Sequence, residues 1–259
     1  MDLGIGGRHA IVCASSKGLG RACATELARN GVLVTINGTS RERLEQAASD
    51  IERETGASVT PVVGDVSTPE GRAALLAACP EPDILVNNNA GPPLKDFREV
   101  DPDAMRRGLE QNMIAPIEMI KLVIDGMQAR RFGRIVNITS ASVKMPILGL
   151  DLSSGARAGL TGFLAGVARS VVKDNVTINF LLPGMFATDR LMDSHVVSAQ
   201  MKGTTTEAYR AAILATLPAG RFGEPSEFGQ ACAYLCSAGA GYVTGQNLLI
   251  DGGWHPSAF

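Results

Sequence analysis

The chain has 259 residues, with 24 Lys and Arg against 26 Asp and Glu, and 45% of its residues are hydrophobic. This composition excludes a disordered chain, and the lack of a basic block argues against nucleic-acid or anionic-membrane binding. No apolar run approaches the ~18 residues of a membrane span, and the first residues do not form a secretory signal. Five scattered cysteines indicate thiols in a reducing compartment, so we expect a cytoplasmic protein without a metal site.

Strand-like and helix-like runs alternate along the whole chain. Apolar runs predict strands at residues 8–14, 32–37, 59–63, 83–87, 134–139, 176–181 and 246–250, with helices at 18–30, 42–54, 69–78, 101–130 and 152–172. Strands that are apolar throughout and separated by helices indicate a parallel sheet covered on both faces. We therefore predict an α/β fold over residues 1–259: a single Rossmann-fold domain with a doubly wound, seven-stranded parallel sheet.

One segment, residues 183–225, departs from this alternation. It contains Met185, Met192 and Met201, followed by a helical stretch at 207–217. An insertion after the carboxyl end of a strand, rich in adaptable apolar side chains, fits a lid over a partly apolar substrate. A docked pair of surface helices explains the same pattern equally well.

A glycine-containing loop follows the first expected strand and opens a helix. Its glycines let a dinucleotide approach the backbone, and the helix N-terminus offers free N–H groups to a pyrophosphate. The first strand of a doubly wound sheet is where such sites form. We therefore expect cofactor contacts from Ser15, Ser16, Lys17, Gly18, Leu19 and Gly20.

From residue 6 to residue 254 the chain resembles the short-chain dehydrogenase/reductase family. The family's loop is Gly-x-x-x-Gly-x-Gly, and Ala14 stands here at the first glycine. Further resemblances are Asp65-Val66 at the adenine contact, Asn88-Asn89-Ala90-Gly91 after strand four, Pro183-Gly184 with Thr188 beside the nicotinamide amide, and Asp251-Gly252-Gly253 near the C-terminus. An extra Asn87 allows the Asn-Asn-Ala-Gly motif a second register. The resemblance implies cofactor contacts from Asp65, Val66, Asn89, Ala90, Gly91, Pro183, Gly184 and Thr188.

The end of the second expected strand indicates which dinucleotide binds. An acidic residue there would bind both ribose hydroxyls and repel a 2′-phosphate, but this strand ends in Asn37. Thr39, Ser40 and Arg41 follow, and the cation of Lys17 adds to them, which suits a phosphate. In the family a base at the Lys17 position accompanies NADP. We expect NADP(H), with NAD(H) as the weaker ligand, and cofactor contacts from Asn37, Thr39, Ser40 and Arg41.

The family resemblance also identifies the catalytic positions. The family uses Ser, Tyr and Lys with an Asn on the long central helix, and Asn112 and Ser140 match two of these positions. Ser153 stands at the Tyr position and Arg157 at the Lys position. A serine hydroxyl is a far weaker acid than a phenol, and an arginine stays protonated near neutral pH. Ordinary carbonyl reduction at a high rate is therefore not expected.

Another group must then supply the proton. Lys144 lies four residues after Ser140, and a lysine desolvated beside Arg157 would become a general acid. An ordinary solvated loop lysine is the equally weighted alternative. Tyr209, in the expected lid, is a further candidate.

Three functions are compatible with these residues. The first is an NADP(H)-dependent oxidoreductase resembling 3-oxoacyl-carrier-protein reductases. The second is a cofactor-binding protein that serves as a sensor or assembly subunit. The third uses the same scaffold for enoyl reduction or a lyase step. Family packing through the helices at 101–130 and 152–172 implies a homotetramer.

Overall fold

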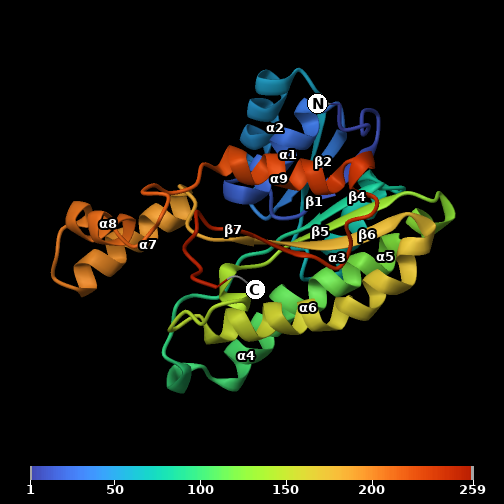
Figure 1. Ribbon diagram of the computed structural model, residues 1–259. Helices are drawn as coiled ribbons and strands as arrows, with labels where there is room; N and C mark the ends of the chain where they lie inside the picture. The colour runs from blue at the N-terminus through green and yellow to red at the C-terminus, as the bar shows by residue number, and fades with distance from the viewer. Residues whose placement is uncertain (1, 258–259) are drawn as a thin grey trace.

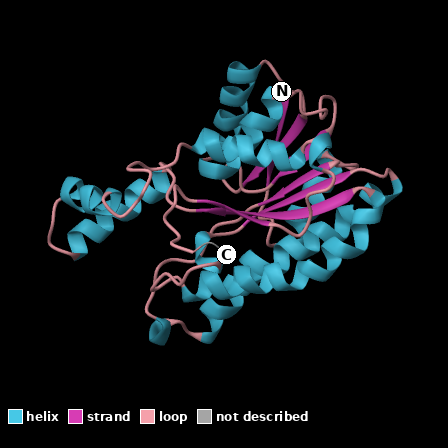
Figure 2. Cartoon of the chain, in the orientation of Figure 1, coloured by secondary structure: helices cyan, strands magenta, loops and turns pink. Residues whose placement is uncertain are grey.

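The computed structural model describes residues 2–257, which fold around one seven-stranded parallel sheet of order β3-β2-β1-β4-β5-β6-β7 (Figures 1 and 2). Its strands are β1 (His9–Val12), β2 (Leu33–Gly38), β3 (Val59–Val63), β4 (Ile84–Asn87), β5 (Gly133–Ile138), β6 (Val176–Pro183) and β7 (Asn247–Ile250). The prediction of a single α/β domain with this sheet is confirmed.

Helices cover both faces of the sheet. They are α1 (Gly18–Arg29), α2 (Arg41–Thr55), α3 (Pro69–Ala78), α4 (Pro102–Leu109), α5 (Ala115–Ala129), α6 (Asp151–Val171), α7 (Asp189–Met201), α8 (Thr206–Leu214) and α9 (Pro225–Cys236). Successive residues of a strand point to opposite faces. Thus Ala10 and Val12 pack in the core under α1, α2 and α9, whereas Ile11 packs in the core under α3, α5 and α6.

The chain reverses its winding direction at β1. This strand pairs with β2 on one side and with β4 on the other, and Val12 is in register with both Ile36 and Val86. In open α/β sheets, ligands bind beyond the carboxyl ends of the strands at such a reversal. The sheet order therefore fixes where the site must lie.

The helix predicted at 101–130 is not uniform. A π-helical turn, Glu110–Ile114, separates α4 from α5, and Asn112 lies within it. The extra residue in a π turn rotates the side chains that follow, and such turns are frequent at functional sites. Periodicity alone could not reveal it because the flanking turns keep the helical pattern.

The segment at 183–225 holds two helices, α7 and α8, where the sequence indicated one helical stretch at 207–217. They lie against each other and project from the body of the sheet (Figure 1). His195 on α7 is buried between Tyr209 and Phe222, with ring centroids 5.4 and 5.5 Å away. A few aromatic contacts therefore hold this pair together.

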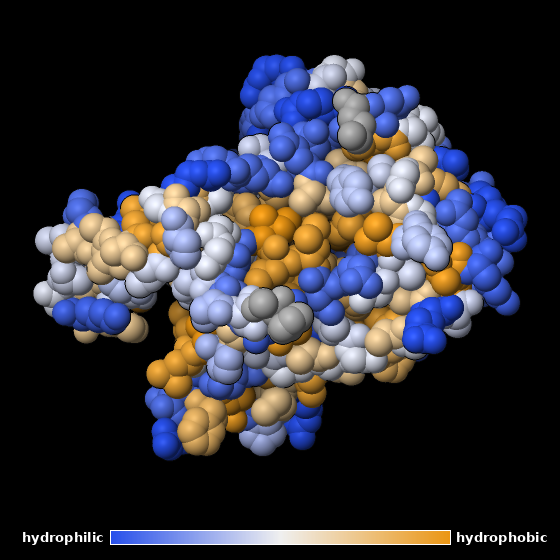
Figure 3. Space-filling model, viewed as in Figure 1, coloured by the Kyte–Doolittle hydropathy of each residue, from blue (hydrophilic) through white to orange (hydrophobic). Residues whose placement is uncertain are grey.

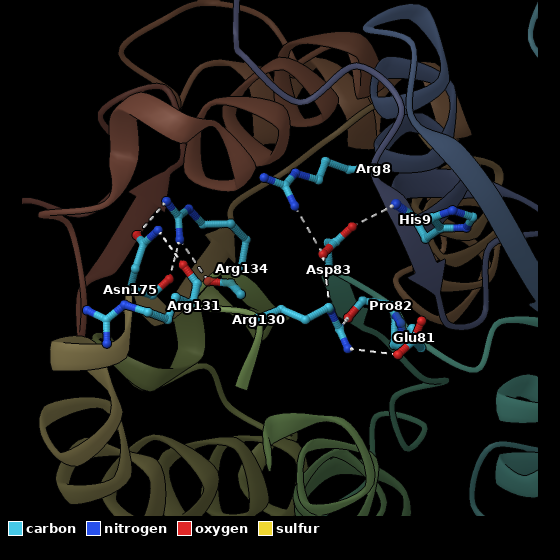
Figure 4. Close-up of polar contacts among 10 residues, drawn as sticks. Arg8, His9, Glu81, Pro82, Asp83, Arg130, Arg131, Arg134 and Asn175 are labelled. Carbon is cyan, nitrogen blue, oxygen red and sulfur yellow. Dashed lines mark hydrogen bonds and ion pairs between the residues drawn. The ribbon is translucent and has the colours of Figure 1, made fainter. Parts of the chain in front are cut away.

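Polar side chains tie the opposite, amino-terminal edge of the sheet (Figure 4). Asp83 accepts hydrogen bonds from Arg8 Nη1 and from the backbone N–H of His9, both at 3.3 Å. Arg134, which is buried, donates to the carbonyl of Asn175 at 2.8 Å. These groups form hydrogen bonds with one another, so we assign this edge a structural role.

All five cysteines are buried free thiols, and burial raises the pKa of the Cys13 thiol to about 12. Between residues 2 and 257, no helix is long and apolar enough to cross a bilayer. The same residues contain no group of three or more His, Cys, Asp or Glu side chains that could hold a metal ion.

Candidate active site

The loop between β1 and α1 forms a cradle with a left-handed backbone at Gly18 and no room for a side chain at Gly20. Gly18 has a φ of +61°, and Ala14 adopts φ +45° despite its methyl group. A Cβ on Gly20 would lie only 2.5 Å from the carbonyl oxygen of Ala14. No side chain caps the start of α1, where Lys17 is the cap residue. Its first N–H groups therefore remain open for an anion.

Two residues predicted to contact the cofactor hold this loop in place through their buried side chains. The Ser15 hydroxyl is buried, where it donates to the carbonyl of Val12 at 2.6 Å and accepts from Asn37 N–H at 3.0 Å. The buried Asn37 amide donates to the carbonyls of Val62 and Gly64 at 3.1 and 2.9 Å. These buried side chains position the loop, and a contact of either residue with the cofactor stays a prediction.

The residues after β2 fit the expected phosphate site. Ser40 begins α2 without a side-chain capping bond, so its hydroxyl and the first N–H groups of the helix remain available. Thr39 and Arg41, on either side of Ser40 in the chain, are exposed, and so is Lys17 in the glycine loop. Arg41 pairs with Glu45 at 3.4 Å, but both side chains are more than half exposed and such a pair is weak. A phosphate can therefore compete for this arginine.

The residues after β3 and β4 lie along the same edge of the sheet. Asp65 is exposed and accepts from Ser67 N–H at 2.8 Å, while Val66 is buried. Asn87 is the last residue of β4 and is buried against Asn137, which places the motif at residues 88–91. Asn88, its first residue, donates to the carbonyl of Ala14 at 3.0 Å and so joins the motif to the glycine loop.

The rest of this motif is fixed from the side of the helices. Asn89 donates to the hydroxyl of Ser67 at 2.9 Å, and Asn112 donates to the carbonyls of Ala90 and Gly108, both at 3.3 Å. Asn112 is 4% exposed. The π turn therefore places its amide against the segment that would face the cofactor.

The segment after β6 closes the other side of the edge. Pro183 ends β6, and a Cβ on Gly184 would lie 2.6 Å from the Cβ of Asp251, so only glycine fits there. Thr188 caps α7 by accepting from Leu191 N–H at 3.4 Å. A Cβ on Gly18 would lie 3.8 Å from the Thr188 methyl group. Thr188 and the glycine loop are thus neighbours.

Ser140, Ser153 and Arg157 meet at the carboxyl end of β5. Arg157 donates from Nε to the Ser153 hydroxyl at 3.1 Å, and from Nη1 to the carbonyls of Ile138 and Thr139, both at 2.9 Å. Ser140 follows directly, and its hydroxyl accepts from Ser142 N–H at 3.1 Å. The hydrogens of both hydroxyl groups remain able to bind another oxygen.

Arg157 is a buried cation. Burial, with a smaller contribution from the charge of Arg190, lowers the pKa of its guanidinium to about 10. That value is still far above neutrality, so Arg157 stays charged and cannot relay protons near pH 7. It can hold a polar group and provide a positive field.

Lys144 and Tyr209 are the two further proton-donor candidates that the sequence offers. Lys144 is exposed, which agrees with the alternative of an ordinary loop lysine. Tyr209 lies on the projecting α8, where its ring packs on His195 and below the ammonium group of Lys202. The structure thus brings neither group into contact with Ser140 or Ser153.

A family model described as enoyl-(acyl carrier protein) reductase matches residues 13–255. The 3-oxoacyl-[acyl-carrier-protein] reductase FabG of Vibrio harveyi is 33% identical over 96% of this chain and 98% of its own length. FabG of Pseudomonas aeruginosa is 32% identical over 97% of this chain and 98% of its own length. The chain belongs to the short-chain dehydrogenase/reductase family.

Solved structures of short-chain dehydrogenase/reductases are similar over nearly the whole chain. YwfH, an NADPH-dependent reductase involved in bacilysin biosynthesis, has a TM-score of 0.90 and 30% identity, covering 97% of this chain and 99% of its own. L-Sorbose reductase from Gluconobacter frateurii, complexed with NADPH and L-sorbose, has a TM-score of 0.93 and 28% identity, covering 99% and 100%. The predicted family resemblance is confirmed.

Sequence reasoning missed one residue of this short-chain dehydrogenase/reductase. Arg190 lies in the first turn of α7 and donates from Nη2 to the carbonyl of Gly91 at 3.1 Å. It therefore bridges the segments after β6 and β4. Its only sequence signal is that it follows Thr188 by two residues, which says nothing of where a long side chain points.

Proposed function

We propose that the chain is an NADP(H)-dependent oxidoreductase that interconverts a carbonyl and a hydroxyl group on a small, partly apolar molecule. One observation carries this proposal: Ser140, Asn112, Ser153 and Arg157 converge at the carboxyl ends of β4 and β5, beside the glycine cradle. Relatives named as 3-oxoacyl-[acyl-carrier-protein] reductases and neighbours described with NADPH support it.

The cradle fits a dinucleotide. Gly18 and Gly20 keep side chains out of it, and the uncapped start of α1 offers N–H groups to a pyrophosphate. Lys17, Ser40 and Arg41 would hold the 2′-phosphate. When bound, the cofactor would supply or accept a hydride.

The two serines would hold the substrate oxygen. Each hydroxyl oxygen already accepts a hydrogen bond from the protein, so each hydroxyl hydrogen would be the group that donates to a ligand. Arg157 strengthens the donor at Ser153 because its charge favours negative charge on the neighbouring oxygen. We propose that Lys144, after a movement of its loop, or a water molecule delivers the proton.

A cofactor-binding protein without turnover, serving as a sensor or assembly subunit, is the second candidate. The specific observation in its favour is that Ser140, Ser153, Asn112 and Arg157 include no acid that titrates near neutral pH. A third use, enoyl reduction or a lyase step, finds support in the description of the matching family model as an enoyl reductase.

A substrate panel separates these candidates. We would follow NADPH oxidation with an acetoacetyl thioester, a crotonyl thioester and an activated ketone, using wild type, Ser140→Ala and the control Ser170→Ala. Ser170 lies at the far end of α6 and bonds only locally. Ketone reduction should fall by about 100-fold in Ser140→Ala and stay unchanged in the control. NADPH oxidation that occurs only with the crotonyl thioester would favour enoyl reduction. NADPH binding without oxidation by any of the three substrates would favour the cofactor-binding protein.

We further propose that α7 and α8 act as the substrate lid. They follow the carboxyl end of β6, and their exposed apolar side chains include Val197 and Met201. Folding over the site would cover an apolar substrate with this surface.

A further inference from the structure

Two guanidinium groups flank Gly91 at the edge of the candidate active site. A Cβ built on Gly91 would lie 3.3 Å from Arg157 Nη2 and 3.1 Å from Arg190 Nη2. Arg157 comes from α6 and Arg190 from the start of α7, so the fold brings together two cations that are distant in sequence. A side chain at position 91 would crowd both groups.

No acid balances these charges within residues 2–257. Neither arginine takes part in an ion pair, although most other arginines of the chain do. The one charged neighbour that shifts the pKa of Arg157 is Arg190, and it lowers that pKa. Two like charges held this close are unfavourable unless an anion joins them, and the more so because only 8% of Arg157 is exposed.

The hydrogen bonds of Arg157 leave one nitrogen of its guanidinium group without a partner among the described residues. Nε binds Ser153 and Nη1 binds two carbonyls of β5, which fixes the plane of the guanidinium. Nη2 donates no hydrogen bond to the described protein and faces Gly91. A lysine ammonium, a point charge without this planar geometry, could not hold the serine and present a second donor in this way.

We propose that Arg157 and Arg190 form an anion-binding site beside Gly91, which takes a carboxylate or phosphate group of a ligand bound at the candidate active site. Planar forks from two elements suit the oxygens of such a group, and bidentate contacts of this kind are strong. The bond from Arg190 to the Gly91 carbonyl is the contact that the anion would replace.

The anion has two chemical sources, the substrate and the cofactor. In the first case, which rests on the proposed function, Nε of Arg157 holds the serine that binds the carbonyl oxygen and Nη2 of the same group binds the carboxylate. The carbonyl oxygen and the carboxylate of the substrate are then separated by about the width of one guanidinium, which fits a 2-oxo or 3-oxo acid. In the second case, the anion is a phosphate of the dinucleotide.

Binding measurements test the site without requiring turnover. Isothermal titration would give the dissociation constant of NADPH, and that of oxamate in the presence of NADP⁺, for wild type, Arg190→Gln and Arg190→Lys. Oxamate carries a carboxylate beside a carbonyl and is not reducible in this reaction. Arg169→Gln is the matched control, since Arg169 is an exposed arginine on α6, three turns after Arg157.

A substrate site predicts that Arg190→Gln weakens oxamate binding by at least about tenfold and leaves NADPH binding unchanged. A cofactor site predicts the same loss for NADPH. In both cases Arg190→Lys should retain part of the affinity and the control all of it. The proposal is overturned if Arg190→Gln changes neither constant by more than about twofold, or if wild type does not bind oxamate and Arg190→Gln leaves NADPH binding intact. Wild type that binds these anions without turnover would refute the proposed function alone.

Discussion

Single atoms decide the geometry of the cofactor loop. Gly20 has no space for even a methyl group, because a Cβ there would lie 2.5 Å from the Ala14 carbonyl and 2.8 Å from the Asn88 amide. Ala14, by contrast, keeps its methyl group in a left-handed conformation that costs about 1 kcal/mol or more. The loop thus contains backbone strain at Ala14 and leaves no space for a side chain at Gly20.

We expect Gly20→Ala to weaken NADPH binding by at least about tenfold and to lower the free energy of unfolding by about 1–3 kcal/mol. The added methyl group must push the Ala14 carbonyl out of the loop. Fluorescence titration and chemical denaturation measure the two effects. Gly6→Ala is the control, because a Cβ there would meet only the Asn30 carbonyl oxygen, at an ordinary 3.8 Å. A Gly20→Ala variant that behaves like this control would contradict the account of the cradle.

Arg41→Gln should reduce the preference for NADPH over NADH by about tenfold, because one charge-assisted contact to the 2′-phosphate is lost. Wild type should bind NADPH at least about tenfold more tightly than NADH. Both constants follow from nicotinamide fluorescence. Arg53→Gln, on the same helix but paired with Asp50, should leave the preference unchanged. Equal affinities in wild type would show that no 2′-phosphate site exists.

At the scale of elements, the helix pair α7 and α8 differs from the rest of the chain. None of the α8 side chains is buried, and α7 buries only His195 and Ala199. The Nδ1 atom of His195 is buried without a hydrogen-bond partner. Few buried contacts mean low local stability, which suits a segment that moves during binding.

This helix pair should loosen as pH falls. Burial, with help from the charge of Arg210, lowers the pKa of His195 below its ordinary 6.5. The unfolded segment therefore takes up a proton more readily than the folded one. The contribution of the neutral His195 to the stability of the helix pair is fully present above about pH 6.5 and declines below it. Hydrogen exchange of α7 and α8 at pH 7.5 and 5.5, corrected for intrinsic rates, would show this loss.

His195→Phe keeps the ring contacts with Tyr209 and Phe222 and cannot titrate. Its α7 and α8 amides should keep the same protection at both pH values. Equal loss of protection in the Phe variant would assign the effect to another group.

At the scale of the whole molecule, apolar surface of the described residues also remains uncovered away from α7 and α8, and two of these areas matter for association. One lies along the outer side of α4 to α6, where the exposed large side chains are Met105, Ile114, Leu122 and Phe163. The other lies around the edge strand β7, where Leu248 and Tyr242 are exposed, and hydrophobic residues gather in the middle of the face shown in Figure 3. Such faces on a single chain favour association.

We propose a homotetramer and expect sedimentation to show it at micromolar concentration. Phe163 is 52% exposed on α6, beside glycines whose Cβ positions are open. Phe163→Glu should therefore dissociate the tetramer through the α6 face. Met201→Glu, a charge placed on the projecting α7, should not. A stable wild-type monomer at this concentration would rule out the assembly.

The sequence by itself determined the fold and the location of the site. Uniformly apolar strands between helices specify a covered parallel sheet, and the loop at Ala14–Gly20 marks its switch point, because these signals depend on residues close together in the chain. Only the tertiary structure decided which polar side chains lie at the candidate active site. Asn37 turns inward to hold the glycine loop, Lys144 stays in solvent, and Arg190 reaches across to Gly91. The direction of a long or buried side chain depends on partners from distant elements, and local pattern carries no record of them.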